Sequence, residues 1–493
     1  MLKKTSTYLL AIISFTVILS TPVYSIAQED NAKKVIPPAF ASSDTMIQQA
    51  FQWASAMALS YRGDPADKVG PWYEAALPAR DAFCMRDVSH QSIGAEILGM
   101  SAENQNMFRW FSKSISESKD WCSYWEINKD GVPAPVDYAN DKEFWYNLNA
   151  NFDVLYAQWK LYEWTGNRIY IDDPAFINFQ QRTVNEYIDR WILQADSLIT
   201  RHPHPNAPVP YDSNNSFHSS RGMPSYSEGA GELIMGVDLV ASIYRALITY
   251  AGILEFKGEK GKAQQFITKA ATYKKVLEQQ WWDKDAQLYF TYYNTDKKFG
   301  KQEGETFLLW FDALSDTHRL EKTISHIATQ KWNAENTSYL PYLFYKFGYW
   351  KEAKDYIKIL NDPATERREY PEVSYGVIEG IVHGLMGISP SASKNVLTTL
   401  LRDDGSHNYK VSGLHLLNTT VSVEHLDANS TIVRNDGKKG FIWQGCFQGT
   451  GKQALVNGRP SKLAVKTGKD HQQPISYLNI FVKPGAQVKV ELR

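Results

Sequence analysis

The chain of 493 residues is 43% hydrophobic and 22% charged, a composition typical of soluble globular proteins. Its length gives room for one large domain and a smaller one. The formal net charge of -1 excludes the broad basic field that dominates affinity for nucleic acid, so no nucleic-acid partner is expected.

The N-terminus has the pattern of an export signal. Lys3 and Lys4 precede the apolar run YLLAIISFTVILS, and Ser25 and Ala27 are small residues that suit a cleavage site. The run is shorter than the ~20 apolar residues of a spanning helix, and no later stretch reaches that length. We therefore expect residues 1–27 to be a cleaved signal peptide, the mature protein to be periplasmic or secreted, and the chain to have no membrane span.

Amphipathic helical patterns follow one another between residues 45 and 390, roughly twelve in all. Short segments separate most of them, which favours antiparallel hairpins, and six hairpins closing into a ring form an (α/α)6 barrel. The predicted helices span residues 45–60, 89–99, 103–118, 144–165, 174–197, 231–257, 260–281, 304–313, 316–329, 336–347, 349–360 and 372–387. Residues 201–229, rich in Pro, Ser and Asn, are predicted to form a long surface loop of the kind that is usually functional.

The pattern changes after about residue 405 to short β-branched segments separated by turns such as NDGKKG and VNGRP. These predicted strands are TVSVEHL, STIVRN, GFIWQGCF, KLAVKT, YLNIFVKPG and QVKVELR. A region of this size suits a β-sandwich. We therefore predict a mainly α-helical protein, with a signal peptide at residues 1–27, an (α/α)6-barrel domain at 28–404 and a C-terminal β-sandwich domain at 405–493.

The cysteines Cys84, Cys122 and Cys446 are too few for a disulfide scaffold and lack CxxC metal spacing. An oxidising compartment permits a bridge between Cys84 and Cys122, whereas three free buried thiols are the alternative. His202 and His204 are expected to be exposed loop residues. No metal and no cofactor is expected.

One loop, LPARDAFCMRDVSHQ at residues 77–91, concentrates charged and hydrogen-bonding groups. It holds the pairs Arg80–Asp81 and Arg86–Asp87, and His90 near its end. A guanidinium fixes a neighbouring carboxylate while both keep hydrogen-bonding capacity for a polyol. Such a pair can grip a ligand or form a salt bridge between loop and barrel, and we expect Arg86–Asp87 to do the first and Arg80–Asp81 the second.

Acidic residues also gather in two later loops. Asp212 and Glu228 lie in the long loop with Arg221, and Glu228 precedes a helix whose dipole could itself favour an acid there. Glu369 and Glu372, in REYPEVSYG, come just before the last predicted helix, which Glu372 could instead cap.

An earlier loop, GVPAPVDYANDKEFWYNLNANFD, contains Asp137, Trp145 and Asn147. Carboxylate and amide groups suit vicinal hydroxyls, and a flat indole can stack on a sugar ring. A helix cap and a solvated loop are the alternative explanation.

The loop RDAFCMRDVSHQ, the segment from Gly236 to Phe290 that ends in WWDKDAQLYF, and EYPEVSYG resemble the six-hairpin glycosidases. That superfamily includes glucoamylase, trehalase and α-L-rhamnosidase, and the resemblance covers most of residues 45–390. It implies Glu228 as proton donor with Asp212 in reserve. It also implies Glu372 as base, with Glu369 in reserve. His218, in SFHSSRG, departs from the W-D-x-S-x-R sequence in which some relatives carry the acid.

The resemblance implies an exo-acting glycoside hydrolase that releases a terminal sugar from an oligosaccharide or polysaccharide, inverting the anomeric centre with two carboxyl groups. The expected sugar-binding residues are Arg86, Asp87, His90, Asp137, Trp145, Asn147 and Arg221. The sugar stays open among an acidic sugar, rhamnose and glucose. An unsaturated-uronyl hydrolase, lyase or epimerase on the same barrel, or a non-catalytic glycan-binding protein, are the alternatives.

Overall fold

The computed structural model describes residues 35–77, 79–227, 231–466 and 474–493. The predicted signal peptide and Glu228 therefore lie outside the described residues. Val35–Arg493 forms one compact unit, so a domain boundary near residue 405 stays a prediction.

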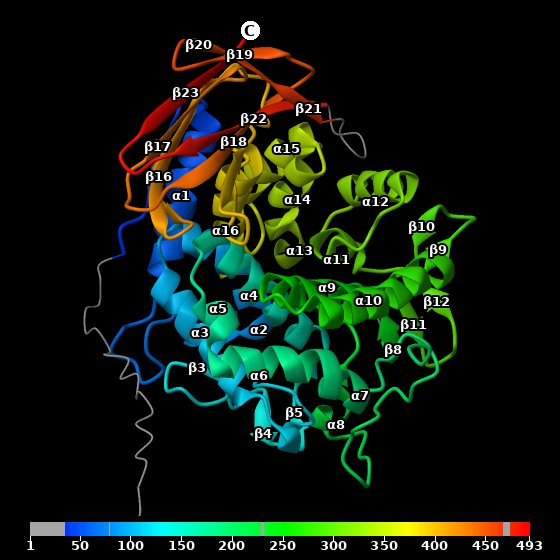
Figure 1. Ribbon diagram of the computed structural model, residues 1–493. Coiled ribbons are helices and arrows are strands. Elements are labelled where there is room, and N and C mark those ends of the chain that lie inside the picture. The colour runs from blue at the N-terminus through cyan, green and yellow to red at the C-terminus, as the bar shows by residue number, and fades with distance from the viewer. Residues whose placement is uncertain (1–34, 78, 228–230, 467–473) are drawn as a thin grey trace, which may run out of the picture. The chain divides into compact units, whose positions relative to one another are not determined.

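Helices dominate residues 45–385, and each predicted helical pattern corresponds to at least one of them (Figure 1). The longer helices are α1 (Thr45–Ser60), α2 (Met85–Ile97), α3 (Ser101–Ser114), α4 (Asn149–Thr165), α6 (Pro174–Arg182), α9 (Val237–Phe256), α10 (Lys260–Gln280), α12 (Thr317–Thr329), α15 (Trp350–Asn361) and α16 (Pro371–Glu379). The shorter ones are η1 (Glu117–Lys119), α5 (Ile169–Asp172), η2 (Thr183–Tyr187), α7 (Ile188–Arg190), α8 (Ser216–Ser220), α11 (Glu305–Trp310), α13 (Ala334–Ser338), α14 (Leu340–Lys346) and η3 (Gly380–Leu385).

Local sequence explains where several helices form. Asp44 caps α1, because its side chain accepts hydrogen bonds from the backbone N–H groups of Met46 and Ile47 at 3.1 and 3.2 Å. In α15 the buried residues Ala353, Tyr356, Ile357 and Leu360 recur at helical spacing and form one apolar face.

The helices pack against one another in a closed cycle of neighbours. Contacts run from α2 to α4, from α4 to α9, from α9 to α11, from α11 to α14, from α14 to α16, and from α16 back to α2. Other long helices pack on members of this cycle: α10 lies along α9 (Figure 1), α1 packs on α16, α3 on α2, α12 on α11 and α15 on α14, whereas α6 packs on α3. The first turns of α2, α13 and α16 supply the candidate site described below.

Two predicted helices begin later than expected. The prediction placed a helix over residues 144–165, but Tyr146–Asn147 (β6) pairs with Arg221–Met223 (β7) and α4 begins at Asn149. Likewise, Leu233–Gly236 (β8) pairs with Tyr292–Asn294 (β11), so the helix predicted from 231 begins at Val237. Pairing with a distant segment overrode the local helical pattern in both places.

One described helix, α9, is long and apolar enough to cross a membrane by length and composition, with 20 residues and a mean hydropathy of 1.5. However, 78% of its apolar window is buried inside the structure. This burial against α4, α10 and α11 is typical of a core helix.

Replacing Gly252, inside α9, with Ala is expected to raise the free energy of unfolding by about 0.5–1 kcal/mol, because Ala loses less backbone entropy on folding. A Cβ atom at Gly252 would meet nothing closer than the Trp159 ring at 3.8 Å. Urea denaturation measures the change. Gly94→Ala on α2 is the control, because its Cβ would lie 2.4 Å from the Tyr375 carbonyl oxygen, and it should destabilise. Loss of stability in Gly252→Ala contradicts the prediction.

Strands make up most of residues 389–492 and form two sheets (Figure 1). The seven-stranded sheet has the order β1 (Ala39–Ser42), β15 (Tyr409–Leu416), β16 (Thr419–Asp427), β17 (Ser430–Asn435), β23 (Gln487–Leu492), β19 (Gln453–Val456), β20 (Arg459–Lys462). The five-stranded sheet has the order β13 (Ser389–Ser391), β14 (Val396–Thr399), β18 (Phe441–Gln448), β22 (Ile475–Val482), β21 (Ala464–Lys466). All pairs are antiparallel except β14 with β18.

All six predicted strand segments are strands. The strands β13 and β14, which precede the boundary predicted near 405, and the strands β15, β19 and β20, which follow it, were not predicted. In β15 the register shifts between Val411 and Leu414, and Gly413 has a φ of 81°. This bulge breaks the alternation that marks a strand in sequence.

Short strand pairs lie among the helices. They involve β2 (Ala82–Cys84), β3 (Glu126–Asn128), β4 (Tyr138–Asn140), β5 (Glu143–Phe144), β9 (Trp282–Asp283), β10 (Leu288–Tyr289) and β12 (Phe299–Gly300). The pair of β2 with β3 holds the start of α2 beside Glu126.

Candidate active site

Two neighbouring cavities lie at the first turns of α2, α13 and α16. We call the larger one, of about 260 Å³, the carboxylate cavity, and the other, of about 200 Å³, the adjoining cavity. Arg86 and Glu335 line both. The carboxyl groups that line the two cavities belong to Asp87, Asp137, Glu303, Glu335 and Glu372.

Glu372 lies in the first turn of α16 and is 4% exposed. Tyr370 precedes the helix and Pro371 is its first residue, a position where the fixed φ of proline suits a helix start. The described residues show no side-chain capping bond at this end. Glu372 lines the carboxylate cavity, and its carboxyl group also interacts with its own backbone N–H at this helix end.

The carboxyl groups of Glu372 and Asp87 lie close enough to share a hydrogen bond, which forms when one of the two carries a proton. Burial, Asp87 and then Glu335 raise the pKa of Glu372 well above its usual range. Asp87 also accepts hydrogen bonds from Cys84 Sγ at 2.7 Å and Arg86 Nε at 3.4 Å. This raised pKa suits a proton donor better than the base expected from the sequence.

A second carboxyl pair lies on the same cavity. Asp137 lines it, and Glu126, on β3, is hydrogen-bonded to Asp137 from behind. Burial and the Asp137 carboxylate raise the pKa of Glu126 to about 9, although Arg80 Nη1 lies 3.2 Å from its Oε2 atom. Glu126 therefore holds a proton at neutral pH.

The Glu126 proton should make stability depend on pH. An unfolded Glu126 loses its proton near 4.5, whereas the folded residue keeps it to about 9. Its contribution to the free energy of unfolding is thus full below about pH 4.5 and lost as the pH rises toward 9. Glu126→Gln, which keeps a donor for Asp137, should flatten this decline in denaturation measured from pH 5 to 9. Exposed Glu117→Gln is the control and should leave the decline unchanged; an equal decline in Glu126→Gln contradicts the prediction.

The two Arg-Asp pairs of the loop behave differently from each other. Arg86 keeps its contact with Asp87 and places its guanidinium 5.4 Å from the centre of the Tyr226 ring. Arg80 and Asp81 do not pair with each other, but both form ion pairs that tie the loop to the segment of β3: Arg80 pairs with Glu126, and Asp81 with Lys129 at 2.6 Å. The positive φ of Asp81, 52°, turns the chain so that the two neighbouring side chains diverge.

Aromatic side chains form part of the cavity walls. Trp125 and Trp145 both line the carboxylate cavity and meet edge to face, with ring centres 4.4 Å apart. Tyr370 lines the same cavity, and Tyr226 and Tyr339 line the adjoining one. The predicted aromatic platform at Trp145 is therefore placed beside the carboxyl groups.

His90 lines the adjoining cavity and is held from behind by Asp153. Its Nε2 atom lies 2.7 Å from Asp153 Oδ2, and Asp153 Oδ1 accepts from Trp310 Nε1 at 3.1 Å. Tyr226 and Tyr339 pack edge-on against the imidazole. The ring orientation of His90 is thus fixed.

Four predicted site residues lie away from both cavities in the described structure. Asp212 and Glu369 are exposed, and the Asp212 carboxylate accepts from the nearby Asn214 backbone at 2.9 Å. Asn147 is fully buried on β6. Arg221 is also buried and pairs with Asp120, so the expectation that it binds substrate is replaced by a structural role.

Sequence reasoning missed Glu303 and Glu335. Glu335 lies in the first turn of α13, which begins after the capping residue Asn333. The predicted helix over 336–347 began one residue after Glu335, so this acid stood at a helix start just as Glu372 did. The position of Glu335 at a predicted helix start could therefore have identified it from the sequence. The placement of Glu303 depends on tertiary contacts, which no local pattern reports.

The three cysteines are free and buried. This confirms the alternative of three free thiols over a bridge between Cys84 and Cys122. Burial and the neighbouring Asp87 raise the pKa of the Cys84 thiol well above its usual range, so Cys84 donates to Asp87 as a thiol. It helps to hold Asp87 in place.

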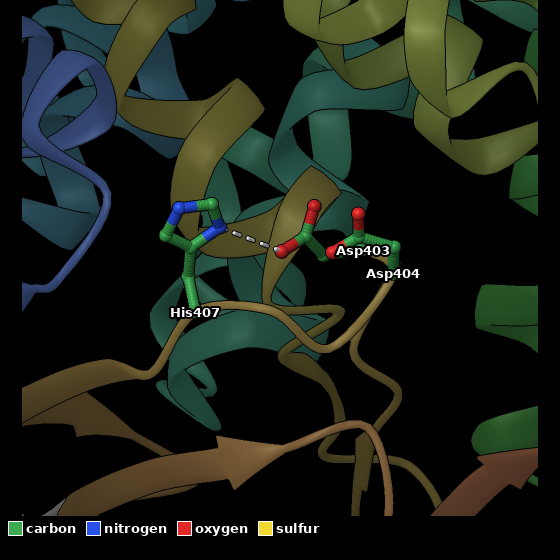
Figure 2. A group of neighbouring side chains, drawn as sticks. All are labelled: Asp403, Asp404 and His407. Carbon is green, nitrogen blue, oxygen red and sulfur yellow. Dashed lines mark ion pairs between the residues drawn. The ribbon is translucent and has the colours of Figure 1, made fainter.

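In the described part of the chain, one group of side chains has donor atoms close enough to share a metal ion: Asp403, Asp404 and His407, within 4.8 Å (Figure 2). Lys354 Nζ already lies 3.7 Å from Asp403 Oδ1 and 2.6 Å from Asp44 Oδ2. Because this ammonium neutralises the carboxylates, the group is explained as an ion-pair network.

The fold resembles that of solved glycosidases. An α-L-rhamnosidase from Dictyoglumus thermophilum matches with a TM-score of 0.60 and 12% identity, covering 93% of this chain and 50% of that one. An α-L-rhamnosidase from Aspergillus terreus matches with a TM-score of 0.54 and 12% identity, over 92% and 51%. A Bacillus rhamnosidase matches with a TM-score of 0.54 and 10% identity, over 80% and 40%.

These matches confirm the resemblance to the six-hairpin glycosidases at the level of the fold. The chain spans about half the length of the first two rhamnosidases. No protein-family model matches the chain, and no curated protein matches its sequence.

Proposed function

We propose that the protein is a glycoside hydrolase that removes a terminal sugar from an oligosaccharide or polysaccharide. The observation that carries the proposal is the pair of neighbouring carboxyl groups of Asp87 and Glu372, which raises the pKa of Glu372, in a cavity walled by Trp125 and Trp145. A carboxyl group whose pKa is raised can protonate a leaving oxygen. Indole rings beside it offer apolar faces for a sugar.

Glu372 is the proton donor in this proposal, and Asp87 positions it. A second carboxylate must activate water from the other face of the sugar. The sequence resemblance points to Glu228, which follows the cavity-lining Tyr226 by two residues in the chain. This exchanges the roles that the sequence suggested for Glu228 and Glu372, because the raised pKa of Glu372 favours the acid. Glu335, which lines both cavities, is the alternative base.

The site fits the end of a chain better than its middle. Cavities of about 260 and 200 Å³ are smaller than most small-molecule sites, which measure roughly 300–1,000 Å³. Arg80 and Arg86 line the carboxylate cavity and offer donors to sugar hydroxyls or to a sugar carboxylate. Rhamnose is the first candidate because of the three structural neighbours, followed by a uronic acid.

The wider architecture belongs to the same proposal. The closed cycle of helix contacts supports an (α/α)6 barrel of six hairpins, and the two sheets support an appended β-sandwich. The Lys3–Ala27 pattern supports export, with the site acting on sugars outside the cytoplasm.

The test is a screen of the full chain against aryl glycosides and oligosaccharides. Release of one monosaccharide, with the anomeric configuration of the first product followed by proton NMR, is the expected result, and inversion is the expected stereochemistry. A product that absorbs as an unsaturated sugar indicates a lyase, and an isomerised sugar without cleavage indicates an epimerase. Binding to the panel without any product overturns the proposal in favour of a glycan-binding protein.

A further inference from the structure

A third cavity, of about 570 Å³, lies between α4, α9 and α14. We call it the Lys160 cavity. None of its described lining residues lines the carboxylate or adjoining cavity. Its volume falls within the roughly 300–1,000 Å³ of small-molecule sites, so it has room for a ligand of its own.

Lys160, on α4, presents its ammonium group in this cavity. Its Nζ atom lies 3.8 Å from the ring centre of Trp310 and 4.8 Å from that of Tyr156. Across the described residues, no carboxylate or carbonyl accepts a hydrogen bond from it. The three N–H donors of an ammonium group are therefore available to a ligand, while the two rings fix its position.

Burial lowers the pKa of Lys160 to about 8, although Glu379 and Asp153 oppose this change. The surrounding carboxylates thus do not compensate the cost of burying the charge. An anion bound at Nζ would supply the missing compensation.

Two further cations line the cavity and share one carboxylate. Arg245 Nη2 lies 3.1 Å from Asp312 Oδ2, and Lys346 pairs with Asp312 Oδ1. The other lining acids are Glu163, which accepts from Ser393 Oγ at 2.5 Å, and the exposed Glu255. Among the described cations that line the cavity, Lys160 is therefore the one that forms no ion pair with a carboxylate.

Flat rings complete the cavity. Tyr156, Trp159, Trp164 and Tyr342 all line it. Gly252, on the opposing α9, faces Trp159: a Cβ atom added to Gly252 would lie 3.8 Å from the Trp159 ring. A cation beside several rings suits a ligand that carries one negative charge on a flat body.

We propose that the Lys160 cavity binds a small carboxylate carried on a ring, with Lys160 as its counter-ion and the aromatic side chains as walls. An acidic monosaccharide and an aromatic acid share this chemistry. The inference is independent of the proposed hydrolysis, because it uses none of the residues of the carboxylate cavity.

Isothermal titration of the full chain with sodium glucuronate and with sodium benzoate tests the proposal. Glucose and benzyl alcohol are the neutral counterparts. At least one carboxylate should bind about tenfold or more tightly than its neutral counterpart, since an unscreened charge pair supplies the difference. Tighter glucuronate indicates an acidic sugar, and tighter benzoate an aromatic acid.

Lys160→Met should weaken this binding by about tenfold or more, because it removes the charge and keeps the length of the side chain. Lys160→Arg should bind within about threefold of the wild type, and it keeps the test open if the Met variant does not fold. Lys275→Met, at an exposed position of α10, is the matched control and should leave binding unchanged. Equal binding of charged and neutral probes, or binding that Lys160→Met leaves intact, overturns the proposal. Hydrolysis is not measured, so failure here leaves the proposed function untouched.

Discussion

Replacing Glu372 with Gln is expected to lower kcat on a natural glycoside by about 10²–10⁴-fold, the range that general acid catalysis contributes. The amide matches the carboxyl group in shape but cannot give up a proton to the leaving oxygen. Because Gln can still donate a hydrogen bond to Asp87, the folded structure and sugar binding should persist. Steady-state kinetics with thermal unfolding of the same preparation measures both.

Glu369→Gln is the matched control for this variant. Glu369 lies three residues earlier in the same segment but is exposed, so its replacement should change kcat by less than about twofold, as at most surface sites. Similar losses in both variants would show that the segment, and not the Glu372 carboxyl group, determines activity.

Replacing Arg221 with Met is expected to lower the free energy of unfolding by about 3–5 kcal/mol, because it removes the buried partner of Asp120 Oδ2 and leaves only the exposed Arg190 on that carboxylate. Arg221 is buried, its guanidinium pairs with Asp120, and it lies 4.7 Å from the centre of the Phe144 ring. Asp120 itself is 2% exposed. Urea denaturation at neutral pH measures the loss.

Arg190 provides the comparison on the same carboxylate. Its Nη2 atom lies 2.6 Å from Asp120 Oδ1, but its side chain is 54% exposed. Arg190→Met should therefore cost about 1 kcal/mol or less, as exposed ion pairs do. If both variants lose the same small amount, the buried pair does not carry the stability assigned to it.

Local patterns predicted the elements of the fold well but not where all of them begin. The apolar spacing of α15 and the β-branched residues of β17 are patterns contained within a few consecutive residues. The structure has a helix and a strand at these two places. The starts of α4 and α9 depend on the pairing of β6 with β7 and of β8 with β11. Those partners lie far away in sequence, so no local pattern reports them.

The candidate site was predicted only in part, because contacts between segments distant in sequence also determine which residues meet there. Arg86, Asp87 and Glu372 stand at helix starts, and the helix packing of α2 against α16 brings them together. Arg221 stands in the loop expected to carry the acid, yet its partner Asp120 is about a hundred residues earlier. Charge in a loop indicated an interaction but not whether the partner was a substrate or the protein itself.

The central claim is that Glu372 protonates the leaving group of a glycoside. The most direct measurement is kcat/KM for the wild type and Glu372→Gln across aryl glycosides whose phenol leaving groups differ in pKa. With a dinitrophenyl leaving group, which needs no proton, the variant should approach the wild type, and with a poor leaving group it should lose about 10²–10⁴-fold. An equal loss across the whole series contradicts the claim and assigns Glu372 to water activation instead.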